Sequence, residues 1–162
     1  MYRRIVGGGQ EMREDLGRAR AFLARGRFAL VGVSRDQRDF SRQVLRELLR
    51  RGYDVVPVNP AMAQVEGRTC HARVQDIRPP VAGALLMTPP ARTEHAVRDC
   101  VEAGIRSVWM HRGSGTGASS PEAEALCRAQ GLEVVADLCP FMALPDSSWP
   151  HRLHRFFRLR AH

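Results

Sequence analysis

The sequence of 162 residues contains no lysine, and all 25 of its basic side chains are arginines. A phosphate-binding loop of the form GxxxxGK[ST] needs a lysine, so this absence excludes that class of nucleotide site. Against 17 acidic side chains, the arginines give a formal net charge of +8. The charge favours an anionic partner, either a phosphorylated small molecule or a nucleic acid, although scattered arginines are also typical of a solvated surface.

Long apolar runs and paired cysteines are missing as well. No run approaches the roughly 20 residues of a membrane helix, and the opening stretch "MYRRIVGGGQEMRED" lacks the apolar core of a signal peptide. We therefore expect a cytoplasmic protein with no membrane partner. The four cysteines form no CxxC pair, and no Cys/His spacing suggests zinc, so we expect neither a metal site nor structural disulfides.

The glycine fingerprint of dinucleotide enzymes is absent from the stretch where it would be expected. Residues 28–60, "FALVGVSRDQRDFSRQVLRELLRRGYDVVPVNP", have the pattern of a strand, a turn, a helix and a second strand. A hydride-transfer site needs GxGxxG in that turn and an acidic residue at the end of the second strand. Here the turn holds only Gly32 and the second strand ends in "PVNP", so the sequence disfavours NAD.

Short apolar strands alternate with amphipathic helices along the chain, which predicts right-handed crossovers and a parallel sheet covered on both faces. We predict a single Rossmann-like three-layer α/β domain with five strands in the order 3-2-1-4-5. Residues 1–10 are predicted to be a flexible leader, and residues 11–162 the domain, which ends in an amphipathic helix. The predicted strands are 28–33, 53–58, 83–87, 107–110 and 133–137; the predicted helices are 11–25, 41–51, 91–103, 121–130 and 149–159.

Ligands of such sheets bind beyond the carboxyl ends of the strands, which directs attention to the turn "GVSRDQRDFS". Gly32 allows the backbone to bend, and Ser34 and Arg35 offer a hydroxyl and a guanidinium group. Ser41 is a suitable N-cap for a helix whose free amides can hold phosphate, with Arg42 as a further phosphate ligand. The alternative is that Ser41 only caps the helix and the arginines are solvated.

The other strand ends are rich in proline. "PVNP" and "TPP" stop their strands and stiffen the exits, which either forms a slot for a flat ring such as adenine or serves strand termination alone. His111 has no obvious carboxylate to orient it, so we assign no catalytic residue. Cys139 follows the last strand near the expected cleft and is the candidate redox residue.

Three segments together resemble one known family: "LVGVSRDQRDFSRQVLRELLRRGYDVVPVNP", "VEGRTCHARVQDI" and "GLEVVADLCP". The family is that of the CoA-binding domain proteins, small Rossmann-like proteins similar to the CoA-binding domain of the succinate–CoA ligase alpha subunit. The resemblance covers about residues 16–145. It implies that the chain binds coenzyme A or an acyl-CoA, in a non-catalytic or regulatory role.

By position, the resemblance implies CoA contacts in four loops. Those at the phosphates would be Gly32, Val33, Ser34, Arg35 and Ser41, with Arg38 as an alternative basic residue. Those around the adenosine would be Val58, Asn59 and Pro60 on one side and Thr88, Pro89 and Pro90 on the other. Those near the pantetheine would be His111, Arg112 and Gly113. The chain has histidine at 111 where the family commonly has glutamine, and "HRGSGTGASS" does not reproduce the phosphohistidine loop of the ligases.

Two other functions stay open. The first is an acyl-CoA-dependent enzyme that uses His111 or Cys139. The second is nucleic-acid binding through the tail "HRLHRFFRLRAH". The phenylalanines of that tail suit the buried face of a docking helix or a homodimer contact, and this disfavours nucleic acid.

Overall fold

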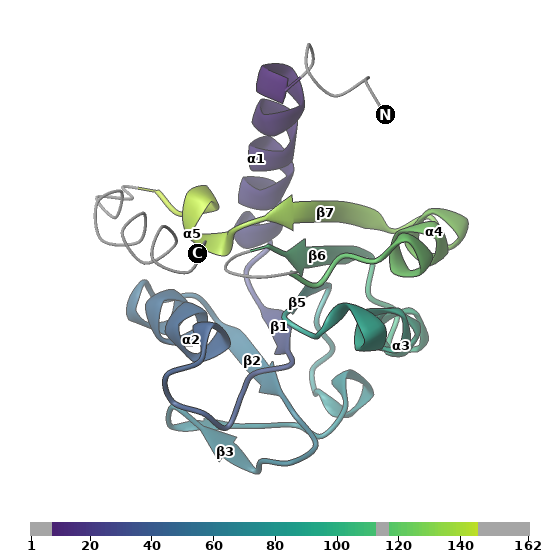
Figure 1. Ribbon diagram of the computed structural model, residues 1–162. Helices are drawn as coiled ribbons and strands as arrows, with labels where there is room; N and C mark the ends of the chain where they lie inside the picture. The colour runs from purple at the N-terminus through teal and green to yellow at the C-terminus, as the bar shows by residue number, and fades with distance from the viewer. Residues whose placement is uncertain (1–7, 113–116, 146–162) are drawn as a thin grey trace, which may run out of the picture.

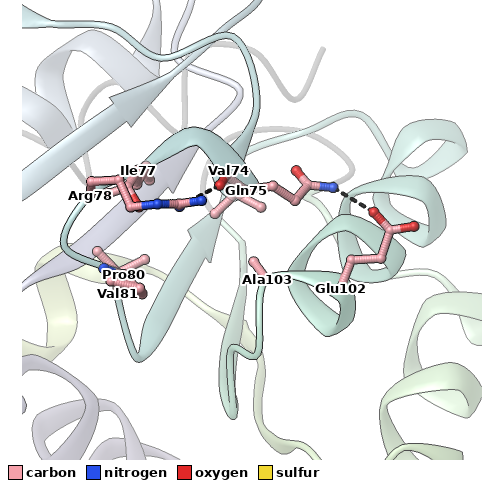
Figure 2. A pocket seen from close by; sticks show the side chains of 8 residues that line it. All are labelled: Val74, Gln75, Ile77, Arg78, Pro80, Val81, Glu102 and Ala103. Atoms are coloured by element: carbon pink, nitrogen blue, oxygen red, sulfur yellow. Dashed lines mark hydrogen bonds between the residues drawn. The ribbon is translucent and has the colours of Figure 1, made fainter.

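The computed structural model describes residues 8–112 and 117–145, and its centre is a five-stranded parallel sheet (Figure 1). The strands are β1 Phe28–Val31, β2 Val55–Val58, β5 Gly83–Leu86, β6 Ser107–His111 and β7 Glu133–Leu138. They lie in the order β2-β1-β5-β6-β7, and every pairing within this sheet is parallel.

Helices cover both faces of the sheet, so the predicted three-layer Rossmann-like architecture is confirmed. One buried cluster joins the strands to α1 Gly8–Ala24, α2 Phe40–Arg50 and the short α5 Pro140–Ala143. A second cluster joins the opposite face to α3 Pro90–Glu102, α4 Pro121–Ala129 and the 3-10 turn η1 Val74–Asp76. Figure 1 shows α1 and α2 on one side of the sheet and α3 and α4 on the other.

Alternating strand residues supply the two clusters. In β1, Phe28 and Leu30 enter the cluster under α1 and α2, and Ala29 enters the cluster under α3. Trp109 is completely buried, meets the ring of Phe22 edge-on at 5.6 Å between centroids, and donates its indole N–H to the Leu138 carbonyl at 3.0 Å. A buried indole needs such an acceptor, so this bond also ties β6 to the end of β7.

The predicted strand order was wrong. In the order of the chain, the observed sheet runs 2-1-3-4-5: the third strand, β5, pairs with β1 in the interior instead of lying outside β2. Both orders satisfy the crossover rule, so the alternation of strands and helices did not decide between them. Pro57 in β2 was the informative signal, because proline cannot donate to a neighbouring strand and favours an edge position.

The connection from β2 to β5 covers the outer edge of β2. His71 donates its N–H to the Pro57 carbonyl at 3.0 Å, and the His71 carbonyl accepts from Asn59 N–H at 2.9 Å. Between them lies a hairpin of β3 Gln64–Val65 and β4 Arg68–Thr69, whose turn consists of Glu66 and Gly67. The edge of the sheet is thereby covered.

The described part of the chain begins with helix α1 and ends at residue 145. α1 begins at Gly8, three residues before the predicted start, and Glu11 in its first turn complements the helix dipole. The predicted C-terminal helix 149–159 lies outside the described residues. Within residues 8–112 and 117–145, no helix combines the length and apolar character needed to cross a bilayer.

Gly32 is the tightest point of the sheet edge, and we expect Gly32→Ala to destabilise the protein more than Gly26→Ala. Both glycines have φ near +90°, so each substitution carries about 1–2 kcal/mol of backbone strain. A Cβ at Gly32 would also lie 3.0 Å from the Met87 carbonyl atoms, whereas at Gly26 it meets nothing within 4 Å. Urea unfolding of both variants measures the difference; equal losses would contradict the close approach of β1 to β5.

Candidate functional site

The site lies at the carboxyl edge of the sheet, where the chain leaves β1 toward β2 on one side and β5 lies on the other. This reversal of strand order is the switch point at which Rossmann-like folds bind ligands. It falls between the first and third strands, because β5 lies between β1 and β6, whereas the predicted order 3-2-1-4-5 would put it between the first and fourth. Gly32, at φ +92°, brings the first turn against the backbone of Met87 and Thr88.

The turn between β1 and α2 is organised by side-chain oxygens. Asp39, and not Ser41 as predicted, is the N-cap of α2, and its Oδ1 accepts from Ser41 N–H at 2.8 Å. The Ser41 hydroxyl donates to the same carboxylate and accepts from Ser34 N–H at 2.9 Å. Ser41 is therefore a buried link between the beginning of the turn and its end.

Three backbone amides of this turn, those of Arg35, Gln37 and Phe40, have no hydrogen-bond acceptor among the described residues. The amides between them are used: Asp36 N–H donates to the Ser34 hydroxyl at 3.1 Å, and Arg38 N–H donates to the Asp36 carboxylate at 2.9 Å. Free amides next to the amino end of an 11-residue helix, where the dipole is positive, attract an anion.

The arginines predicted to bind phosphate separate into two groups. Arg35 and Arg38 are exposed, and their guanidinium groups have no partner in the described part of the chain. Arg42 is 8% exposed and its guanidinium group is bonded to Glu66, so these donors are already used within the protein. Arg92, in the first turn of α3, is exposed and also without a described side-chain partner, and the sequence prediction missed it.

The exit of β2 is tied to the first turn by Asn59. Its Nδ2 donates to the Val33 carbonyl at 2.7 Å, and its Oδ1 accepts from Ala61 N–H at 2.7 Å. Val33 and Val58 are core side chains, at 0% and 4% exposure, so only their backbone can face a ligand. Pro60 is exposed beside them.

The exit of β5 forms the opposite side of the site. Thr88 is buried and its hydroxyl lies 2.8 Å from that of Thr93, which also donates to the Pro89 carbonyl at 3.2 Å. Pro89 is exposed and Pro90 opens α3. These bonds make the "TPP" segment a fixed wall.

His111 at the end of β6 is a buried, neutral side chain. Its Nδ1 lies 3.1 Å from the Leu86 carbonyl, an acceptor, so the proton is on Nδ1. Burial lowers the pKa of His111, and the bond to Leu86 and the charge of Asp39 oppose this only in part. The ring stacks on Phe40 at 5.8 Å between centroids, and Phe40 also meets Phe141 edge-on at 5.6 Å. The sequence prediction did not include Phe40 in the site. The signal that could have found it is an aromatic residue directly before the predicted helix 41–51.

Cys139 precedes α5, is half-buried and has a free thiol. Burial raises its pKa, although backbone N–H groups of Phe141 and Met142 oppose the shift, so the thiol stays protonated near neutral pH. This gives no support to the predicted redox role. The other three cysteines are buried free thiols. In the described ranges no group of three or more His, Cys, Asp or Glu side chains could hold a metal ion.

Arg112 is exposed after β6 and lies 3.6 Å from the carboxylate of Asp137, where the β6–β7 register shifts. Asp137 has φ +55°, a conformation that bulged strands use to redirect a side chain. Gly113, the last predicted contact, lies outside the described residues. The described residues among the predicted contacts thus lie at the exits of β1, β2, β5 and β6, on one edge of the sheet.

The fold is a Rossmann-like domain, and its first turn leaves backbone amides free at the amino end of a helix. The family model described as "CoA binding domain" matches residues 26–145, which include all five strands and every strand exit of this edge. The chain belongs to this CoA-binding domain family.

Several solved structures are similar to this chain in sequence and fold. The redesigned protein Prb is 31% identical over 79% of this chain and 88% of its own, with a TM-score of 0.71. A hypothetical protein from Pyrococcus horikoshii OT3 is 30% identical over 88% of this chain and 95% of its own, with a TM-score of 0.69. A dinucleotide-forming acetyl-coenzyme A synthetase from Ca. Korarchaeum cryptofilum is 28% identical over 71% of this chain and 26% of its own, with a TM-score of 0.59.

The lowered pKa of His111 has a consequence for stability. Where the unfolded chain binds a proton and the folded protein does not, stability falls as the pH falls. This loss begins near the ordinary histidine pKa of about 6.5 and ends below the folded-state value. We expect His111→Gln to reduce the loss between pH 7 and pH 5, as measured by thermal unfolding. A variant with the same pH dependence as the parent would contradict a neutral buried imidazole.

Proposed function

We propose that the protein binds coenzyme A or an acyl-CoA at the carboxyl edge of the sheet, across the exits of β1 and β5. The observation that carries the proposal is the family match, which spans the first turn and all the strand ends. The first turn supports it independently, because it holds free amides, two unpaired arginines and the amino end of a helix.

CoA carries several phosphate charges, which suits the donors of the first turn. The amides of Arg35, Gln37 and Phe40 would take phosphate oxygens, and the side chains of Arg35 and Arg38 would add charge-assisted bonds. Arg92 faces the same edge from the start of α3 and is a second source of charge. Arg42 is not a phosphate ligand in this proposal, because Glu66 and backbone carbonyls occupy its donors.

The remaining loops would hold the uncharged parts of the ligand. Pro60 and Pro89 are exposed at the exits of β2 and β5 and suit the faces of the adenine ring. Phe40 and His111 form a stacked pair on the β6 side, where the pantetheine arm would pass. Asn59 would not contact the ligand through its side chain, since its Nδ2 and Oδ1 both bond backbone groups of the protein.

The proposed role is binding without turnover. His111 uses its Nδ1 proton on a backbone carbonyl, and no carboxylate in the described residues accepts that proton. Burial raises the pKa of the Cys139 thiol, so it is a poor nucleophile at neutral pH. No observation favours an acyl-CoA enzyme built on these two residues.

Arg35→Ala should weaken CoA binding by roughly tenfold, because a bond to a charged group is worth about 1.5–3 kcal/mol and solvent screening reduces this at an exposed site. Adenosine, which has no phosphate, should bind the variant and the parent equally. Calorimetric titration with both ligands measures this. Arg20→Ala, an exposed arginine on α1, is the matched control and should change neither affinity.

The proposal fails outright if the parent protein shows neither heat nor a thermal shift at millimolar CoA. An equal loss of CoA and adenosine affinity in Arg35→Ala would instead refute the placement of phosphate at this turn.

A further inference from the structure

Glu66 has a backbone conformation that its residue type disfavours. In the turn of the β3–β4 hairpin it has φ +47°, the left-handed region, which is strained for a residue with a side chain. Residues persist in such conformations where the surrounding contacts fix them. The carboxylate of Glu66, 21% exposed, supplies those contacts.

Two arginines of α2 converge on this carboxylate. Arg42 Nε and Arg46 Nε each donate to Glu66 Oε1 at 2.9 Å. These bonds lower the pKa of Glu66, with the bond from Arg46 as the largest cause, so the group is a carboxylate at neutral pH. Glu66 therefore joins the hairpin at the sheet edge to the face of α2 beside the first turn.

The same two arginines hold backbone carbonyls of the first turn with their other nitrogens. Arg42 donates to the carbonyls of Ser34 and Arg35 at 3.2 and 3.3 Å. Arg46 donates to the carbonyl of Gln37 at 3.0 Å. The chain of contacts is continuous: carboxylate, guanidinium groups, then the carbonyls of the turn.

The peptide plane passes the restraint on the Ser34 carbonyl to one free amide, that of Arg35. The restraints on the next two carbonyls reach the hydrogen-bonded amides of Asp36 and Arg38. In a trans peptide the carbonyl of one residue and the N–H of the next point in opposite directions. When Arg42 holds the Ser34 carbonyl, the Arg35 N–H must point away from Arg42. An isolated surface ion pair contributes little to stability, whereas these arginines also hold the backbone of the turn.

We propose that Glu66 is a positioning residue which, through Arg42 and Arg46, fixes the first turn in the conformation that presents its amides to an anionic ligand. The effect on CoA rests on the function proposed above; the effect on the free turn does not. Glu66 lies 24 residues after Arg42 in the sequence, and among the described residues its carboxylate bonds the two arginines and not the turn itself.

The test compares Glu66→Gln with Glu47→Gln. Glu47 also accepts bonds from two arginines of the α2 region, Arg50 and Arg51, which lower its pKa to about 2. It lies toward the other end of α2 from the turn. Glu47→Gln thus removes an equivalent ion pair without touching the site.

Amide hydrogen exchange in the ligand-free protein is the first measurement. The amides of Ser34, Asp36 and Arg38 are hydrogen-bonded within the turn and should exchange several-fold faster in Glu66→Gln and at the parent rate in Glu47→Gln. Unchanged exchange in Glu66→Gln would overturn the proposal, whatever happens to CoA binding.

CoA affinity is the second measurement. We expect a loss of about tenfold in Glu66→Gln and no loss in Glu47→Gln. Glu66→Asn separates positioning from folding, because asparagine tolerates the left-handed conformation: it should keep the parent's thermal stability and still lose affinity. Faster exchange with unchanged affinity would overturn the ligand effect. A parent that does not bind CoA would refute the function and leave faster exchange as support for the positioning.

Discussion

The close packing of the first turn against the exit of β5 is the constraint on which the site depends. Gly32 lies so near the Met87 carbonyl that a single methyl group would have to displace backbone atoms. That approach requires β1 and β5 to be neighbours, which in turn places the reversal of strand order between them. The location of the proposed ligand site therefore follows from the strand order and from one glycine.

Around this contact, side chains of the protein bond some backbone groups of the first turn and leave other backbone amides without an acceptor among the described residues. Ser41 and Asp39 bind its amides at the beginning of α2, Asn59 binds the Val33 carbonyl from β2, and arginines bind its later carbonyls. The amides left over are the ones that an anion can take. A preformed turn of this kind binds with little ordering cost, which is the advantage of preorganisation.

The sequence predicted the parallel sheet and its helices because wholly apolar strands and amphipathic helices leave strong local patterns. Local patterns did not determine strand order, although Pro57 indicated an edge strand. That the first turn binds the ligand stays a prediction, whereas the structure corrects the roles of individual residues in it. Asp39 and Ser41 are both good caps by type, and only the structure shows which one caps. The bond from Arg42 to Glu66 depends on the hairpin geometry, which no local pattern specifies.

The central claim is that the free amides of the first turn bind a phosphate group of CoA. Nitrogen-15 NMR titration tests it most directly, because it observes each amide separately. We expect CoA to produce large shifts at the amides of Arg35, Gln37 and Phe40, and adenosine to produce only small ones there. CoA-induced shifts that leave these three amides unmoved and cluster elsewhere, such as the opposite edge of the sheet, would contradict it.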